Sequence, residues 1–587
     1  ISAGAITEGA GGSITANLLT GHSVGNTTLD GNNHINMLGS FSADFSLTNG
    51  QTLTVEGPLD GGPLVALTTT AGDLIINGAV TGTTTTLTSA GAISEGANGI
   101  ITADTLSGSS AGSTSLLGAN RVATLGAFTS GGDFAFNTIR TLTVNDAPSA
   151  NGGAGDLTLT ASGANSDLIL ASTLTGNTVT LGAGRNINQT AGAIHANTLT
   201  GSSVGSTALG GANHIGTLGN FTAANFALTN AQALAVNGSV NGGASTTLKT
   251  TSGNLAINGT VKGTTTTLAS AGAITEGAGG SIVAGMLTGS SAGATTLNGA
   301  NQIGTLGSFT AANFALTSAQ ALTVDGPLDG GASTSLKTTS GDLAINGSVK
   351  GTATSLTSAG AISEGASGII TAGTLSGSAV GPTVLGSASS PNKNMVDTLG
   401  NFTSLAGFSM TNDKTLTLAS VAGSAFTVNA GTSPFYLSVT HGDLFQLGTT
   451  PLYDGIGVWG STGRLGSSSQ PIYVVGTGLQ NIANVGLPPA YFYAVDSSGN
   501  LLPLGGGFAI NVPTASGAGS AQNGNHGDSY IDPSVITANY RSYGIVPSGV
   551  RLPPDQQSGC DPDQPDQAAC QDPDALGMVM PWPKAPQ

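Results

Sequence analysis

The chain contains few charged residues, few aromatic residues and few cysteines, all of which globular enzymes commonly use. Of its 587 residues only 7% are charged and 4% are aromatic, and there are two cysteines. No run of about 18 apolar residues exists, so no helix is expected to span a membrane. The 13 basic residues form no cluster against 30 acidic ones, and the formal net charge is −17. Nucleic acid as a partner is therefore excluded, because its recognition needs a basic surface.

Catalytic and metal-binding patterns are also missing. There is no phosphate-binding loop, HExxH or repeated CxxC. The segment HGDSYID at 526–532 places His526, Asp528 and Ser529 in one loop, where adjacent side chains rarely form a triad. The Thr runs at 82–87 and 263–268 occur at most once per repeat, so they predict no ice-binding face. We expect no enzyme activity and no cofactor.

What the chain does have is a long internal repeat, which is the first feature to look for. The phrase SAGAITEGAGG at 2–12 returns from residues 89, 270 and 358, and a degraded copy, GAGRNINQTAG, begins at 182. The steps are thus 87, 93, 88 and 88 residues. The segment LDGNNHINMLGSF at 29–41 returns in step, for example as LNGANQIGTLGSF at 297–309.

Within each repeat, short apolar bursts alternate with Gly, Asn or Asp, as in TLTVEG at 52–57 and DLIING at 73–78. This pattern predicts short strands and tight turns, with few helices. Coils of roughly 20–22 residues fit the size of a solenoid repeat. We predict an all-β fold over 1–430, a parallel β-helix of five units of about 88 residues, stabilised inside by corner ladders. A β-sandwich array is the alternative.

Each full copy of the phrase carries one Glu, namely Glu8, Glu95, Glu276 or Glu364, and Asn188 stands there in the degraded copy. Copies about four coils apart are separated by about 19 Å along the axis. That is too far for carboxylates acting on one substrate, which need about 5–9.5 Å. We interpret these glutamates as solvent-facing residues on turns of the scaffold.

The LxGAN segment allows a prediction of facing. The position after its Asn varies among His34, Arg121, His214 and Gln302, and the next position stays β-branched. The variable position is expected to face out, and Ile35, Val122, Ile215 and Ile303 to face in. His34 and His214 are then exposed and far apart, so they predict no metal site.

The composition changes towards the C-terminus, where all Tyr and both Trp lie beyond residue 435. We expect an atypical β cap at 431–548 and a Pro/Asp-rich tail at 549–587. The cap's aromatic residues are either a shield for the last coil or a binding surface. The candidate binding residues are Tyr453, Trp459, Tyr491 and Tyr493. The tail's close pair, Cys560 and Cys570, predicts a disulfide in an oxidising compartment, with a metal site using the neighbouring aspartates as a weaker reading.

The repeat units and the closing Cys pair resemble the exoproteins of two-partner secretion, the filamentous-haemagglutinin-like and high-molecular-weight adhesins. The resemblance covers residues 1 to about 430 and implies a right-handed parallel β-helix, exported through an outer-membrane transporter of a Gram-negative bacterium. The resemblance does not extend to the family's amino-terminal secretion domain. By the position of the Cys pair, the resemblance implies tethering through the tail at the outer cell surface.

The adhesin branch also implies glycosylation at Asn-x-Ser/Thr, for which the chain offers Asn26, Asn237, Asn258, Asn346 and Asn401. Together these observations predict a secreted adhesin and structural rod that contacts a glycan or protein of a host or neighbouring cell. A self-assembling filament subunit, built by head-to-tail association, is the alternative. A polysaccharide-active β-helix enzyme comes third.

Overall fold

The computed structural model describes residues 1–386 and 394–418 and, beyond them, seven strands. These strands are β44 (Phe426–Gly431), β45 (Phe435–Val439), β46 (Leu444–Gln446), β47 (Ile456–Gly460), β48 (Ile472–Gly476), β49 (Ala490–Val495) and β50 (Leu501–Leu502). The chain divides into two compact units, Ile1–Ile303 and Gly304–Gln587.

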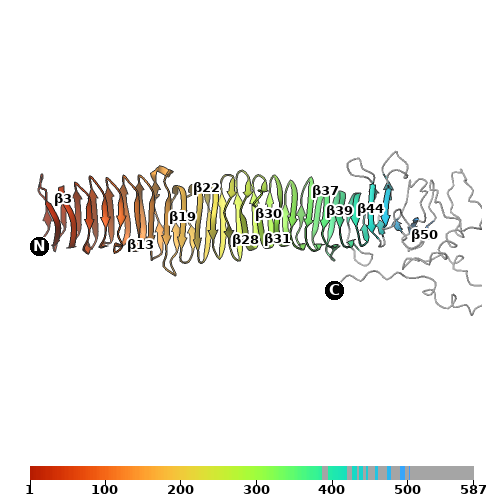
Figure 1. The fold of residues 1–587 in the computed structure, drawn as a ribbon, viewed down its shortest axis with the longest axis horizontal. Coiled ribbons are helices and arrows are strands. Elements are labelled where there is room, and N and C mark those ends of the chain that lie inside the picture. Colours follow the sequence, from red (N-terminus) through yellow and green to blue (C-terminus); the bar gives the residue numbers. More distant parts are fainter. Residues whose placement is uncertain are drawn as a thin grey trace, which may run out of the picture. The chain divides into compact units, whose positions relative to one another are not determined.

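Each unit by itself is all-β and has the parallel β-solenoid fold that the repeat pattern predicted (Figure 1). The sandwich alternative is wrong, because the described strands before β50 pair in parallel, and an antiparallel pair is formed by β49 with β50. The one helical element among the described residues is a single 3₁₀ turn, η1 (Asn151–Gly153).

The first repeat shows how a coil is built. A long strand, β3 (Thr27–Ser42), is followed by shorter strands separated by corners of two to four residues. These are β4 (Phe45–Asn49), β5 (Leu53–Val55), β6 (Leu59–Asp60), β7 (Leu64–Thr69), β8 (Leu74–Ile76), β9 (Ala79–Thr81), β10 (Thr84–Ser89), β11 (Ile93–Glu95) and β12 (Ile100–Ser110). Phe45 pairs with Val65, and Thr85 with both Val65 and Leu106, so one coil takes about 20 residues.

Long bulged strands recur where the LxGAN segment recurs: β13 (Thr114–Ser130), β22 (Ser206–Thr222) and β31 (Ala294–Thr310). The register of β3, β13 and β22 shifts within the strand, as it does at a β-bulge. Ile35, Val122, Ile215 and Ile303 are all fully buried, so their predicted facing is confirmed. At the variable position, which was predicted to face out, Arg121, His214 and Gln302 are exposed, but His34 is half-buried.

The core is a column of aliphatic side chains, with one phenylalanine pair per repeat. The two ring centroids of each pair lie 4.7 to 5.0 Å apart, in Phe41–Phe45, Phe128–Phe134, Phe221–Phe226, Phe309–Phe314 and Phe402–Phe408. Alternation of buried and half-buried residues along strands such as β4 and β17 (Leu157–Ala161) follows from the two-residue period of a strand.

Polar ladders line the inner corners, as predicted. The side chain of Asn49 bonds both backbone groups of Ile35, accepting at 2.8 Å and donating at 2.9 Å. Asn230 does the same to Ile215. The hydroxyl of Thr69 donates to Ser89 at 3.0 Å one coil later. These bonds satisfy backbone groups that the corners leave without a strand partner.

Candidate functional site

The repeated glutamates are not solvent-facing turn residues; that prediction is wrong. In the first copy, Glu8 Oε2 accepts the Gly31 amide at 2.7 Å and the side-chain amide of Asn33 at 3.1 Å. Asn33 is fully buried. The Glu8 carboxylate thus contacts the next coil, where the buried Asn33 side chain donates a hydrogen bond to it.

The same contact recurs in the other full copies. Glu95 Oε2 accepts from Gly118 at 2.7 Å and from Asn120 at 3.0 Å. The corresponding distances for Glu276 are 2.6 Å to Gly299 and 3.0 Å to Asn301. Glu364 accepts from Asn394 at 2.8 Å. We call each set of Glu, Gly and Asn a carboxylate node.

The degraded copy keeps the hydrogen bonds of the node, but an uncharged side chain takes the place of the glutamate. Comparison of the repeat copies predicted Asn188 in the place of the glutamates, but in the structure Gln189 takes that place. Gln189 Oε1 accepts the Gly211 amide at 2.9 Å and the Asn213 amide at 3.0 Å. The alignment missed this because the loop from Gln189 to Ile194 is one residue shorter than that from Glu8 to Ile14.

Burial dominates the electrostatics of the nodes. It raises the pKa of the Glu95 and Glu276 carboxyls above the ordinary value, although hydrogen bonds from their Gly and Asn partners act in the opposite direction. Burial raises the pKa of Glu364 to about 7. A carboxyl removed from water without a cation nearby is costly in its charged form.

Two histidines lie closer together than the sequence suggested. We expected His214 to lie far from His34 and named no histidine as its neighbour. Its ladder partner is instead His195, whose ring stacks on it at a centroid distance of 4.9 Å. Their separation of 19 residues is one coil, a signal that the sequence carried. Across the described ranges, no three His, Cys, Asp or Glu side chains gather as metal ligands.

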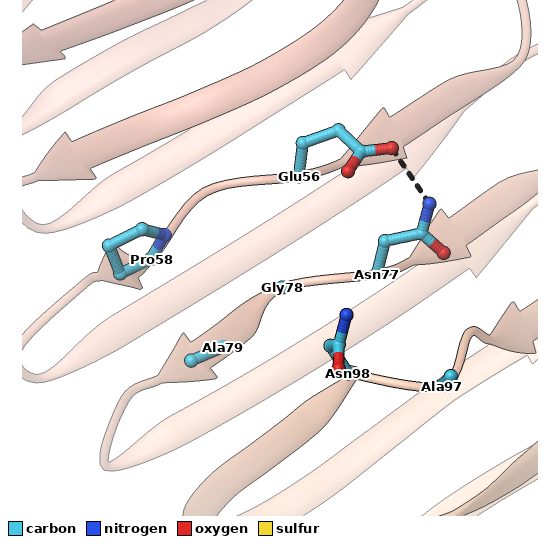
Figure 2. Close-up of a pocket in the computed structure, with 7 residues that line it drawn as sticks. All are labelled: Glu56, Pro58, Asn77, Gly78, Ala79, Ala97 and Asn98. Atoms are coloured by element: carbon cyan, nitrogen blue, oxygen red, sulfur yellow. Dashed lines mark hydrogen bonds between the residues drawn. The ribbon is translucent and has the colours of Figure 1, made fainter.

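An open pocket of about 470 Å³ lies on an outer corner where the first repeat is followed by the second. Figure 2 shows its polar side chains Glu56, Asn77 and Asn98, which follow β5, β8 and β11 on successive coils. The Asn77 amide donates to Glu56 Oε1 at 2.7 Å. The equivalent corners hold Asn237 with Asn258 at 2.8 Å and Asp325 with Asn346 at 3.0 Å. One carboxylate and amides in an open corner suit a hydroxyl-rich ligand.

Those corners contain three of the five candidate glycosylation sites. Asn237, Asn258 and Asn346 are exposed, but Asn258 and Asn346 use their amide nitrogen to bond the preceding coil. Asn26 is exposed and Asn401 is half-buried in β41 (Met395–Ser404). Glycosylation at these positions stays a prediction.

The C-terminal predictions lie largely outside the described residues. Tyr453, Cys560 and Cys570 are not described. Trp459 falls on β47, and Tyr491 and Tyr493 fall on β49, as backbone positions only. The aromatic surface, the disulfide and the domain limits at 430 and 548 therefore stay predictions. None of the described residues forms a helix of the length and hydropathy that a membrane span needs.

Comparison with known proteins gives no match: no family model, no curated protein and no solved structure resembles the chain closely enough to be matched. Its nature as a parallel β-helix repeat protein therefore rests on the sequence repeat and the structure.

Proposed function

We propose that this chain is a secreted adhesin and structural solenoid of the filamentous-haemagglutinin-like kind, exported by two-partner secretion and held at the outer cell surface by its tail. The observation that carries the proposal is the chemistry of the outward faces. Some of the outward-facing ladders are rows of half-buried hydroxyl side chains. Thr158, Thr180 and Thr200 lie in register on successive coils.

A second row consists of Thr247, Thr267 and Thr288, and the hydroxyls of Thr267 and Thr288 are 3.0 Å apart. Successive rungs of such a row are about 4.8 Å apart. Uncharged hydroxyl rows offer regularly spaced donors and acceptors to a polar polymer without electrostatic steering. A glycan, or the polar surface of a protein, is the partner that fits them.

Adhesion is tested by replacing one row of threonines while the fold of the solenoid coils is kept. We expect Thr158→Glu, Thr180→Glu and Thr200→Glu together to lower binding of the purified protein to whole cells and to a glycan array. The matched control puts Glu at Thr143, Ile169 and Asn188, half-buried residues in register on another face of the same region. Equal loss of binding in both triple variants, or none in either, contradicts a row-specific adhesive surface.

Tethering is tested by fractionating producing cells that carry wild-type protein or Cys560→Ser, with and without reductant. We expect wild type on the cell surface, and the variant or the reduced protein in the medium. Identical partitioning contradicts the anchor. Electron micrographs of purified protein that show long fibres instead of single molecules would favour the self-assembling filament.

A further inference from the structure

Each carboxylate node has one oxygen that its surroundings leave unused. The Oε1 atoms of Glu8, Glu95, Glu276 and Glu364 are buried and have no hydrogen-bond partner. A buried acceptor without a partner loses its water and gains nothing in return. The same defect in four copies of one corner is a property of the corner.

Gln189 shows what the corner accommodates in that place. Its Nε2 donates to the Gly192 carbonyl at 3.1 Å and to Asn213 Oδ1 at 2.8 Å. Its other amide atom accepts the same two bonds that a node glutamate accepts. The corner therefore satisfies a side chain that donates from one terminal atom and accepts at the other.

The Glu276 node offers the same two acceptors. Asn301 Oδ1 already accepts the Ile282 amide at 2.7 Å, as Asn213 Oδ1 accepts that of Ile194 at 2.8 Å. The Gly280 carbonyl lies 2.6 Å from where a Cβ of Gly299 would stand, and the Gly192 carbonyl lies 2.6 Å from that of Gly211. A donor at Glu276 Oε1 would thus have the acceptors that Gln189 uses.

The segments packed around the Glu276 node contain no other charged side chain. The segments packed around Glu276 are the preceding corner at 253–260, its own loop at 272–284 and the next coil at 294–303. None of them contains another Asp, Glu, His, Lys, Arg, Cys or Tyr. Neutralisation by a neighbouring cation is therefore not available from these segments.

We propose that Glu95, Glu276 and Glu364 are proton-binding latches: a proton on Oε1 turns each of these carboxyls into a donor equivalent to the Gln189 amide and tightens the contact between adjacent coils. The latch makes the solenoid respond to the acidity of its surroundings. This property goes beyond adhesion and does not depend on the proposed function.

The direction follows from linkage. Burial raises the pKa of Glu276 in the folded chain above that of the unfolded chain. The folded chain then binds more protons than the unfolded one between these two pKa values. The stabilisation is fully present below the unfolded pKa and is lost as the pH rises through the folded pKa.

The test uses two reciprocal variants of the full chain, Glu276→Gln and Gln189→Glu, and amide hydrogen exchange read by mass spectrometry at pH 5 and pH 8. In wild type, the peptide covering 294–303 should be better protected at pH 5, after correction for the intrinsic exchange rate. The gain is up to about tenfold for each unit by which the pKa is raised. Glu276→Gln should keep this peptide protected at both pH values. Gln189→Glu should give the same pH dependence to the peptide covering 206–215.

The proposal is overturned if Glu276→Gln leaves the pH dependence of 294–303 unchanged, or weakens protection at both pH values. A second readout does not depend on stability. The infrared carbonyl band of a protonated carboxyl should be present in wild type at pH 5 and smaller in Glu276→Gln. Added Ca²⁺ should not protect 294–303 at pH 8; protection by Ca²⁺ would identify a cation, not a proton, as the bound species.

Discussion

Gln189 and Asn213 are joined by two hydrogen bonds, one in each direction: the Asn213 amide donates to Gln189 Oε1, and the Gln189 amide donates to Asn213 Oδ1. The glutamate copies make only the first of these bonds. The repeat therefore contains its own comparison between an uncharged amide and a titratable carboxyl in one corner. The nodes combine a structural contact with a titratable group.

The first prediction concerns the asparagine of a node. Asn120 donates to Glu95 Oε2 and to the Asn137 carbonyl, and its Oδ1 accepts the Ile101 amide at 2.6 Å. Asn120→Ala removes these three bonds and a fourth to the Leu116 carbonyl, and leaves a half-buried carboxyl with one donor fewer. We expect a loss of about 3 kcal/mol or more in the free energy of unfolding at pH 8, measured by urea unfolding followed by circular dichroism.

The loss should be smaller at pH 5, because the pKa of Glu95 is raised by burial and the carboxyl is then closer to its neutral form. The matched control is Asn213→Ala, where the partner is the uncharged Gln189, so its cost should change little with pH. If both variants show the same pH dependence, the charge of Glu95 is not what Asn120 stabilises.

The second prediction concerns close backbone approach between coils. A Cβ at Gly184 would collide with the Gly163 carbonyl oxygen, whereas a Cβ at Gly210 would meet nothing within 4 Å. We expect Gly184→Ala to destabilise the chain by about 1–3 kcal/mol through overpacking. Gly210→Ala should be neutral or stabilising by about 0.4–1 kcal/mol. Thermal unfolding of the two variants checks this, and similar midpoints would contradict the collision.

The third prediction concerns the phenylalanine pairs. Phe128 is fully buried, and its ring centroid lies 4.9 Å from that of Phe134. Phe128→Ala should cost about 3–5 kcal/mol, since it removes a large side chain and leaves a cavity. Leu117→Ala, at a position 55% exposed, should change stability by no more than about 0.5 kcal/mol. Urea unfolding of both variants would show whether the pairs carry the expected share of core stability.

The fold was predictable because the repeat displays its own burial pattern. The constant β-branched position of LxGAN identified Ile35, Val122, Ile215 and Ile303 as buried without any structure. Apolar bursts broken by Gly and Asn identified the strands and corners. A hydrophobic core arranged by a two-residue period needs only local sequence to be recognised.

The nodes were not predicted, because the surroundings of a corner residue come from the next coil. Glu8 looks like an exposed turn residue until Asn33 is placed beside it. The signal was present: Glu8, Glu95 and Glu276 each precede a buried Asn by 25 residues, and Gln189 precedes Asn213 by 24. In a solenoid, a recurring separation near one coil length indicates contact, and the same reasoning would have paired His195 with His214.

The last prediction uses an acidic residue whose pH dependence has the opposite sign. The side chain of Arg185 donates to both carboxylate oxygens of Asp167, and this holds the Asp167 pKa below its ordinary value. The stabilisation from this pair is present above the ordinary pKa of an aspartate and is lost as the pH falls towards the folded value. Arg185→Ala should cost little at neutral pH, because Arg185 is exposed and salt screens such pairs. Urea unfolding at pH 3 and pH 7 should therefore show that the free energies of unfolding of wild type and Arg185→Ala converge in acid. For Glu276→Gln, the difference from wild type should be largest in the alkaline range and should also disappear in acid. If Arg185→Ala instead diverged further from wild type at pH 3, the pair would be stabilising the chain through something other than the ionised Asp167.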